Sequence, residues 1–124
     1  MTKNFSLKEF KCPCPCTENH IKIELLHALQ RVRDYLEPED SIQITSGYRC
    51  PEYNKIVGGK ETSSHVKGLA ADLHIESSGK AFRVMQAIFL SRTFNRVGFG
   101  KRDGKLVLHV DIDESKIKDV LWGY

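Results

Sequence analysis

Three side chains combine the residue types that bind a transition metal. His65, Asp72 and His109 supply two imidazoles and one carboxylate, a donor set found at catalytic zinc sites in which a fourth position stays open for water. His65 precedes Asp72 by seven residues, and the segment between them contains Gly68, where the chain can fold back. Spacing alone leaves two interpretations open: a metal site, or ordinary polar positions on strands.

The alternation of apolar and polar residues predicts the strands that carry two of these side chains. In residues 70–75 every second residue is apolar and faces the core, which turns Asp72 outward. In residues 105–113 the same alternation places His109 and Asp111 together on the face opposite the apolar one. Each strand therefore offers one apolar face and one face that carries polar chemistry.

A further predicted strand, residues 41–49, carries Arg49 on its polar face together with Thr45 and Gly47. Its apolar face comprises Ile42, Ile44 and Tyr48. A shorter run at residues 96–101 is also typical of a strand. Asp103-Gly104 favours a tight hairpin turn between that run and the strand at 105–113.

Helices are predicted where apolar residues recur at three- and four-residue steps. One such helix spans about residues 19–36, and a second spans about 80–92, with an apolar face of Phe82, Met85, Ile88 and Phe89. A short helix at 51–57 begins at a proline and ends at Gly58-Gly59. Because helices and strands are segregated, we expect an α+β fold with a small, mainly antiparallel sheet flanked by helices. We expect one domain over residues 1–124, with an N-terminal Cys/Pro arm at 1–19 and a core that bears the motifs at 41–113.

The string at residues 63–72, S-S-H-V-K-G-L-A-A-D, resembles the pattern S-x-H-x-x-G-x-A-x-D of the zinc D-Ala-D-Ala carboxypeptidases and the related LAS-type peptidoglycan metallopeptidases. Upstream, S-G-Y-R at 46–49 is similar to another block of that family. Downstream, G-F-G at 98–100 and L-H-V-D at 108–111 resemble its glycine turn and H-x-D strand. The resemblance covers roughly residues 41–113 and implies a hedgehog/DD-peptidase-like fold.

The resemblance implies a zinc ion held by His65, Asp72 and His109, and hydrolysis of peptide bonds in peptidoglycan stems or cross-links, by a carboxypeptidase or an endopeptidase. Arg49 resembles the family's arginine, which holds the substrate or stabilises the developing oxyanion. A surface ion pair is the alternative for Arg49. Ser63 is predicted to contact substrate or to orient a ligand, with a plain loop cap as the alternative.

The general base is where the chain departs from the family. Several members place Glu or His two or three residues before the last zinc histidine, and Val107 and Leu106 stand there in this chain. Asp111 lies about 7 Å beyond His109 on the same strand face, so it is predicted either to act as the base or to orient a ligand. His74, which shares a face with Asp72, is the weaker alternative. His20 and His27, both on the first predicted helix, are interpreted as surface groups.

Four cysteines, Cys12, Cys14, Cys16 and Cys50, form the second group of metal-binding residue types. The C-P-C-P-C string has tighter spacing than the usual zinc motif. Free thiols, disulfides and a second, structural metal site all remain open at this level. A thiol redox role is disfavoured because the string lacks the spacing of C-x-x-C.

Composition excludes several classes of protein. Nineteen Lys and Arg are interspersed with sixteen Asp and Glu among 124 residues, for a net charge of +3, which argues against nucleic-acid binding. No apolar run approaches a membrane span, and the N-terminus lacks a signal-peptide pattern. We therefore expect no membrane partner and synthesis in the cytoplasm, with action on the cell wall after lysis or as a virion component, as for a phage endolysin. We expect a monomer.

The alternative function is a non-catalytic, zinc-containing wall-binding or virion structural domain on the same fold. The missing acids at positions 106 and 107 keep this alternative open.

Overall fold

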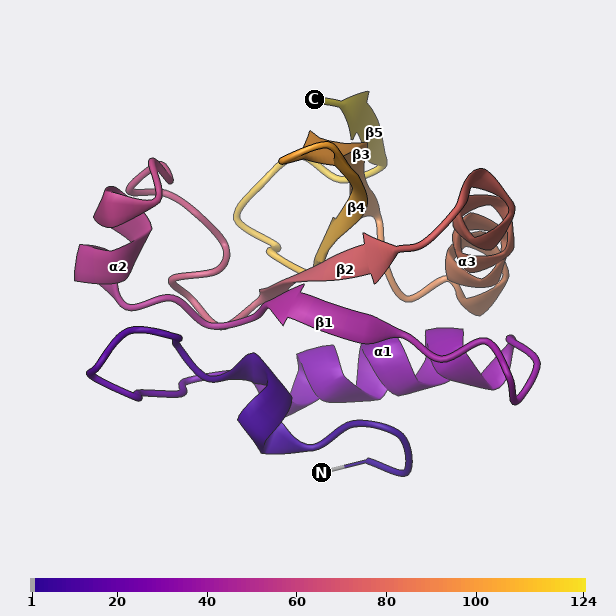
Figure 1. Cartoon of the computed structure of the whole chain (residues 1–124), viewed down its shortest axis with the longest axis horizontal. Coiled ribbons are helices and arrows are strands. Elements are labelled where there is room, and N and C mark those ends of the chain that lie inside the picture. The colour runs from indigo at the N-terminus through magenta and orange to yellow at the C-terminus, as the bar shows by residue number, and fades with distance from the viewer. Residues whose placement is uncertain (1) are drawn as a thin grey trace.

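The computed structural model describes residues 2–124 as an α+β fold built on one five-stranded mixed sheet (Figure 1). The strand order is β1-β2-β4-β3-β5, and every neighbouring pair is antiparallel except β3 and β5. In chain order the elements are the 3₁₀ helix η1 (Leu7–Phe10), α1 (Ile23–Asp34), β1 (Gln43–Ser46), α2 (Pro51–Ile56), β2 (Ala70–Ile75), α3 (Ser78–Ser91), β3 (Arg96–Arg102), β4 (Lys105–Asp111) and β5 (Val120–Gly123). The predicted fold class is confirmed.

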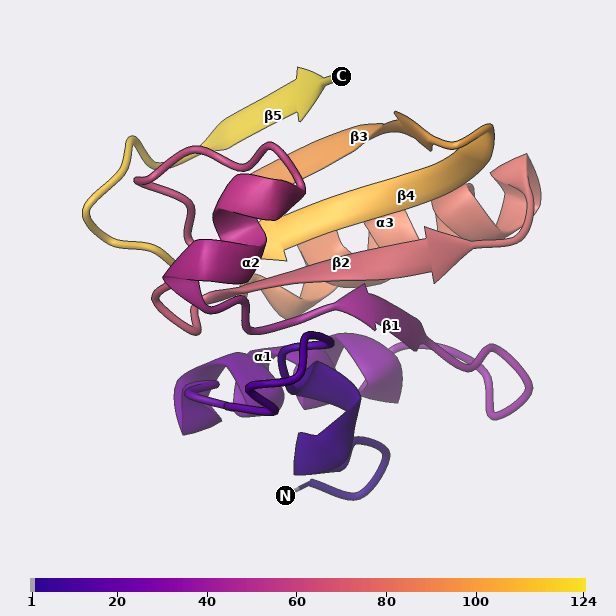
Figure 2. The same ribbon diagram turned by 60° about the vertical axis from the view of Figure 1, so that its left-hand side comes forward.

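The main core lies between one face of the sheet and helices α1 and α3, whereas α2 lies on the other side (Figure 2). Apolar residues of β2 and β4 that alternate along each strand supply the sheet side of this core, namely Ala71, Leu73, Ile75, Leu108 and Val110. Burial of each large aliphatic side chain contributes about 1.5–3 kcal/mol. This face therefore fixes the register, and the alternate residues must point toward the side of α2.

Helix α1 is shorter than its periodicity predicts. It begins at Ile23 because Lys22 is still extended, and the Lys22 N–H donates to the carbonyl of Gly68 at 3.0 Å. Gly68 adopts φ +73°, and a Cβ there would lie 2.0 Å from the carbonyl oxygen of His20. The residues before α1 therefore contact the loop that follows His65 through a backbone hydrogen bond and close packing, and do not continue the helix.

The prediction for the apolar face of α3 was wrong in part. Phe82 is 69% exposed and Phe89 is 55% exposed. The residues that face the core are smaller, comprising Ala81, Val84, Ala87 and Ile88. Small side chains allow α3 to approach α1 and β2 closely, which leaves no room for two phenyl rings between them.

The strand predicted at 41–49 ends at Ser46. The register shifts between Ile44 and Ser46, and a shift of this kind ends strict alternation. Tyr48 consequently leaves the main core and packs in a separate cluster with Cys12 and Cys50. The alternation argument that placed Arg49 therefore does not extend past the end of β1.

The predicted hairpin turn forms between β3 and β4, whereas the last strand, β5, was not predicted. Asp103 and Gly104 both have positive φ, 53° and 77°, as a two-residue turn between antiparallel strands requires. β5 has no counterpart in the predicted elements. It pairs parallel to β3, with Gly98 opposite Trp122.

The N-terminal segment packs against the rest of the molecule through Phe5 and Phe10, which are 2% and 0% exposed. The Tyr48 N–H donates to the Phe10 carbonyl at 2.7 Å. Gly47 allows this approach, because a Cβ at that position would lie 2.7 Å from the Phe10 Cα. The segment thus lies directly against the chain that leads into Arg49.

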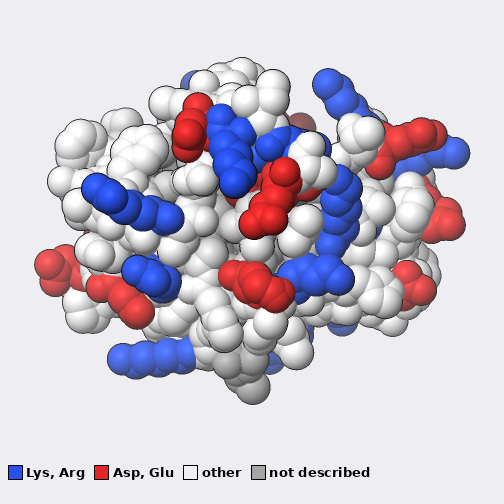
Figure 3. Space-filling view, turned by 180° about the vertical axis from the view of Figure 1, so that it is seen from behind, with Lys and Arg blue, Asp and Glu red and all other residues white. Residues whose placement is uncertain are grey.

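Charged side chains of both signs alternate over the back of the molecule (Figure 3). Among the described residues, no helix has the length and apolarity that a membrane span requires.

Candidate active site

The sheet register builds a row of facing residues across four strands. Asp72 of β2 pairs with His109 of β4, His109 pairs with Gly98 of β3, and Gly98 pairs with Trp122 of β5. Gly98 provides the space for the indole, since a Cβ there would lie 2.7 Å from Trp122 Cε2. The Trp122 ring centroid consequently lies 5.6 Å from that of His109.

His65 joins this row from the loop before β2. Its Nε2 lies 3.2 Å from Asp72 Oδ1, and its Nδ1 lies 2.7 Å from the carbonyl oxygen of Gly47. A carbonyl oxygen can only accept, so Nδ1 carries the hydrogen and donates it to Gly47. In the neutral imidazole, Nε2 then carries no hydrogen, and its lone pair faces Asp72.

His109 has the complementary arrangement. Its Nε2 lies 2.8 Å from Asp111 Oδ2, and its Nδ1 lies 2.9 Å from Asp72 Oδ1. Burial raises the pKa of Asp111, but hydrogen bonds from His109 and from the Asp113 backbone lower it below its usual value. The ionised Asp111 therefore accepts from Nε2–H, and in the neutral imidazole Nδ1 carries the second lone pair aimed at Asp72.

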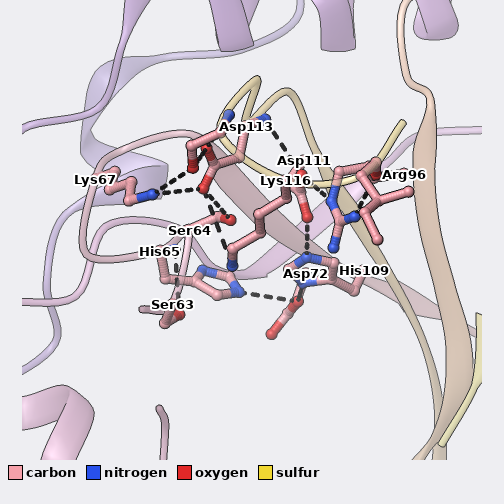
Figure 4. A network of polar contacts seen from close by, with 12 residues as sticks. Ser63, Ser64, His65, Lys67, Asp72, Arg96, His109, Asp111, Asp113 and Lys116 are labelled. Atoms are coloured by element: carbon pink, nitrogen blue, oxygen red, sulfur yellow. Dashed lines mark hydrogen bonds and ion pairs between the residues drawn. The ribbon is translucent and has the colours of Figure 1, made fainter. Parts of the chain in front are cut away.

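Three acceptor atoms thus converge, the Nε2 of His65, the Oδ1 of Asp72 and the Nδ1 of His109, all within 4.8 Å of one another (Figure 4). When no ion is bound, burial raises the pKa of Asp72, but hydrogen bonds that His109 and His65 then donate to it outweigh burial and hold the pKa well below its usual value. Lone pairs that converge in this way repel one another unless a proton or a metal cation lies between them. The three residues can hold a metal ion, and their donor set fits zinc.

Both carboxylate oxygens of Asp111 accept hydrogen bonds. Besides His109, it accepts from Arg96 Nε at 2.9 Å and from the Asp113 N–H at 3.2 Å, both at Oδ1. Its side chain is 1% exposed, and the Arg96 side chain is 15% exposed. Arg96 also lies over the Trp122 ring, with its Cζ 5.2 Å from the ring centroid.

Asp113 holds the loop that carries His65. Its carboxylate accepts from Ser64 Oγ at 2.8 Å, from Lys67 Nζ at 3.0 Å and from Ser115 Oγ at 2.6 Å. Burial raises the pKa of Asp113, but these hydrogen bonds lower it well below the usual range. Ser63 completes the loop, because its Oγ accepts from the His65 N–H at 3.2 Å.

Arg49 is buried beside the three converging acceptors, with 7% of its surface exposed. The backbone N–H of Arg49 donates to the backbone carbonyl of His65 at 3.2 Å. Burial lowers the pKa of Arg49, and the nearby charge of Asp72 opposes that shift. Within residues 2–124 its Nε is buried without a hydrogen-bond partner. An unpaired buried guanidinium donor that lines a cavity is suited to bind an anion.

These groups line one cavity of about 310 Å³. Ser63, His65, Asp72, His109, Asp111 and Arg49 all contribute to its wall. The wall also includes residues that sequence reasoning missed, namely Lys60, Arg96, Arg102, Lys116, Trp122 and Tyr124. Arg102 Nη1 lies 3.4 Å from Asp72 Oδ2. Its position in the hairpin opposite Lys105 is readable from sequence, but its reach to Asp72 is not.

The remaining histidines lie outside the converging set. His27 is exposed on α1, His20 packs edge-on against Tyr48 with ring centroids 5.0 Å apart, and His74 is half-buried opposite Val107. The four cysteines come together in a second cluster whose sulfur atoms also lie within 4.8 Å of one another.

Among known proteins, the chain is similar to one family. No curated protein matches the chain. The sequence profile of the family described as Peptidase M15 matches residues 3–111, which include the cysteine-rich segment, the loop at His65 and all of β2 and β4. The match spans most of the chain and both clusters of metal-binding residue types, and the chain accordingly belongs to the peptidase M15 family.

Proposed function

We propose that the chain is a zinc-dependent peptidase that hydrolyses peptide bonds in the stems or cross-links of bacterial peptidoglycan. The observation that carries this proposal is the convergence of three acceptor atoms, from His65, Asp72 and His109, beside Arg49, whose buried Nε has no hydrogen-bond partner in the described part of the chain. The family is one of peptidases, so the substrate contains a peptide bond.

Three residues of the site would bind the metal ion, and a fourth positions one of them. His65 and His109 present lone pairs in fixed tautomers, and Asp72 supplies the one negative charge between them. A zinc ion held there would polarise the scissile carbonyl and lower the pKa of water, because two neutral imidazoles and one carboxylate leave the ion a net positive charge. Asp111 acts as a positioning residue, since it fixes the tautomer and the ring orientation of His109.

Arg49 binds the anionic part of the reacting peptide. Its buried Nε has no partner among residues 2–124, and a donor that is already oriented stabilises charge that develops on the scissile carbonyl oxygen. Ser63 supplies a hydroxyl at the wall of the same cavity. We assign Ser63 to substrate binding alongside Arg49.

The charge of the cavity wall supports a substrate that carries carboxylates, as peptidoglycan stems do. Five basic residues line the cavity, Arg49, Lys60, Arg96, Arg102 and Lys116, against two acidic residues, Asp72 and Asp111. This basic excess attracts and orients anionic peptides. Action on the wall follows lysis or delivery within a virion.

The test is digestion of purified peptidoglycan, followed by mass analysis of the released fragments. Wild type is expected to cleave the stems or cross-links, and cleavage should be lost on chelation and restored by zinc. His65→Ala should abolish cleavage, whereas His27→Ala, an exposed histidine on α1, should cleave as wild type does.

The alternative is a domain that binds the wall through the same fold without cleaving it. It predicts that wild type and His65→Ala leave identical, intact stems while both remain folded. That result would overturn the peptidase proposal.

A further inference from the structure

The four cysteines form a compact cluster that joins two distant segments of the chain. Cys12, Cys14 and Cys16 lie in the N-terminal segment, and Cys50 is the N-cap of α2. The views in Figures 1 and 2 show the N-terminal loop next to the start of α2. The sulfur of Cys12 lies 3.7 Å from that of Cys50, across 38 residues of sequence.

The four sulfur atoms lie close enough together to reach one ion, although Cys14 and Cys16 are nearer each other than two ligands of a bound zinc. Besides the Cys12–Cys50 distance, the Sγ–Sγ distances are 3.4 Å for Cys12–Cys14, 3.5 Å for Cys14–Cys50 and 2.9 Å for Cys14–Cys16. A tetrahedral zinc ion with Zn–S bonds of about 2.3 Å separates its sulfur ligands by about 3.8 Å. Cys14 is near three other sulfurs at once, an arrangement that a disulfide between one pair does not require.

Backbone groups around the cluster are arranged as they are around metal-bound thiolates. The N–H of Cys50 donates to Cys12 Sγ, that of Tyr53 to Cys50 Sγ, and that of Glu18 to Cys16 Sγ, each at 3.4 Å. Such N–H···S hydrogen bonds stabilise negative charge on sulfur.

The loop that presents the first three cysteines is closed on itself. The Cys12 N–H donates to the Glu18 carbonyl at 2.8 Å, and the Thr17 N–H donates to the Cys14 carbonyl at 3.1 Å. Thr17 has φ +55°, which reverses the chain direction directly after Cys16. Pro13 and Pro15 restrict the backbone between the cysteines. The tight C-x-C spacing is thereby compatible with ligation, because the loop curves around the sulfur atoms.

From this geometry we propose that Cys12, Cys14, Cys16 and Cys50 bind a structural zinc ion, separate from the site at His65. Four thiolates complete a tetrahedral shell and leave no open position, so this ion has no catalytic role. Its function is to cross-link the N-terminal segment to Cys50. The neighbouring residue is Arg49, and the Gly47 carbonyl three residues before Cys50 orients His65. The cysteine-bound ion therefore supports the segment that positions both groups.

The test is metal content together with cobalt spectroscopy on the full-length chain, prepared without oxygen. Wild type is expected to bind two ions per chain, one at each cluster. Cobalt bound by thiolates gives an intense sulfur-to-cobalt charge-transfer absorption, which a site made of nitrogen and oxygen ligands does not produce. His65→Ala should bind one ion and keep this absorption.

Cys12→Ser should bind one ion and lose the charge-transfer absorption. Because Cys12 is buried, Cys16→Ser provides a second variant at an exposed position, and it should weaken the same absorption without altering the fold. Alkylation of the denatured, unreduced chain should modify all four cysteines. A wild-type chain that binds one ion without thiolate absorption, or one with fewer than four reactive thiols, would overturn the proposal. Neither result bears on cleavage by the site at His65.

Discussion

His109 Nε2 lies 2.8 Å from Asp111 Oδ2, two residues further along the same face of β4. The contact determines which nitrogen of His109 keeps its lone pair, and that nitrogen, Nδ1, lies 2.9 Å from Asp72. Both oxygens of Asp111 have partners, so its carboxylate is better placed to hold His109 than to move a proton.

Asp111→Asn is expected to weaken metal binding by about 10- to 100-fold. The amide can donate to His109 Nε2, which would shift the hydrogen to Nδ1 and point it at Asp72. Competition with a chelator measures the affinity. A variant that binds metal normally but loses about 10²–10⁴ in kcat would instead identify Asp111 as the general base.

Arg49→Lys is expected to lower kcat/KM by about 10²–10³ with unchanged metal content. Lysine keeps the charge but lacks the planar fork of donors, and its ammonium is more costly to bury. Steady-state kinetics on a defined stem peptide and metal analysis provide the two measurements. Arg31→Lys, at an exposed position on α1, should match wild type. Normal kinetics in Arg49→Lys would mean that Arg49 does not contact the reacting peptide.

Gly98→Ala is expected to displace Trp122 from His109, because the added Cβ would lie 2.7–2.8 Å from three atoms of the indole. Trp122 is the only tryptophan in the chain, so its fluorescence reports this change directly. The emission should shift to the red, and its response to added metal should diminish. Gly79→Ala, near the start of α3, places its Cβ at ordinary contact distance and should leave the spectrum unchanged.

Asp113→Asn is expected to cost about 1.5–3 kcal/mol of unfolding free energy near neutral pH, through weaker hydrogen bonds to Ser64 and Lys67. The pKa of Asp113 is lower in the folded than in the unfolded chain. Its contribution is therefore complete above the unfolded value of about 3.9 and declines as pH falls toward the folded pKa. The difference between wild type and variant should be constant from neutral pH to about pH 5 and shrink in more acidic solution.

Denaturant unfolding at a series of pH values, with a chelator present to remove the pH dependence of metal binding, measures this difference. Asp119→Asn, at an exposed position, serves as the control and should show little effect at any pH. A penalty for Asp113→Asn that persists unchanged in strong acid would contradict the role of the ionised carboxylate.

Much of the site follows from local pattern. The alternation in 70–75 and 105–113 predicts that Asp72 and His109 share the polar face. Both strands form with those faces, although β4 ends at Asp111. The Asp-Gly turn also forms as expected. These predictions succeed because side-chain direction along a strand depends only on parity and on which face is buried.

Other features depended on contacts between distant segments. The bulge that ends alternation before Arg49 and the exposure of Phe82 on α3 both reflect packing, which a single element's pattern does not encode. The placement of Trp122 against His109 requires β5 to add to the sheet beside β3.

The sequence by itself thus determined the types of the metal-binding residues, the strands that carry two of them, and the resemblance to a peptidase family. Only the tertiary structure decided that His65 meets Asp72 and His109, that Asp111 holds His109, and that Cys50 joins three cysteines from the N-terminal segment. The physical reason is that local pattern specifies the face on which a side chain lies, whereas atoms meet within hydrogen-bond or ligand distance only after loops close and strands pair in one register.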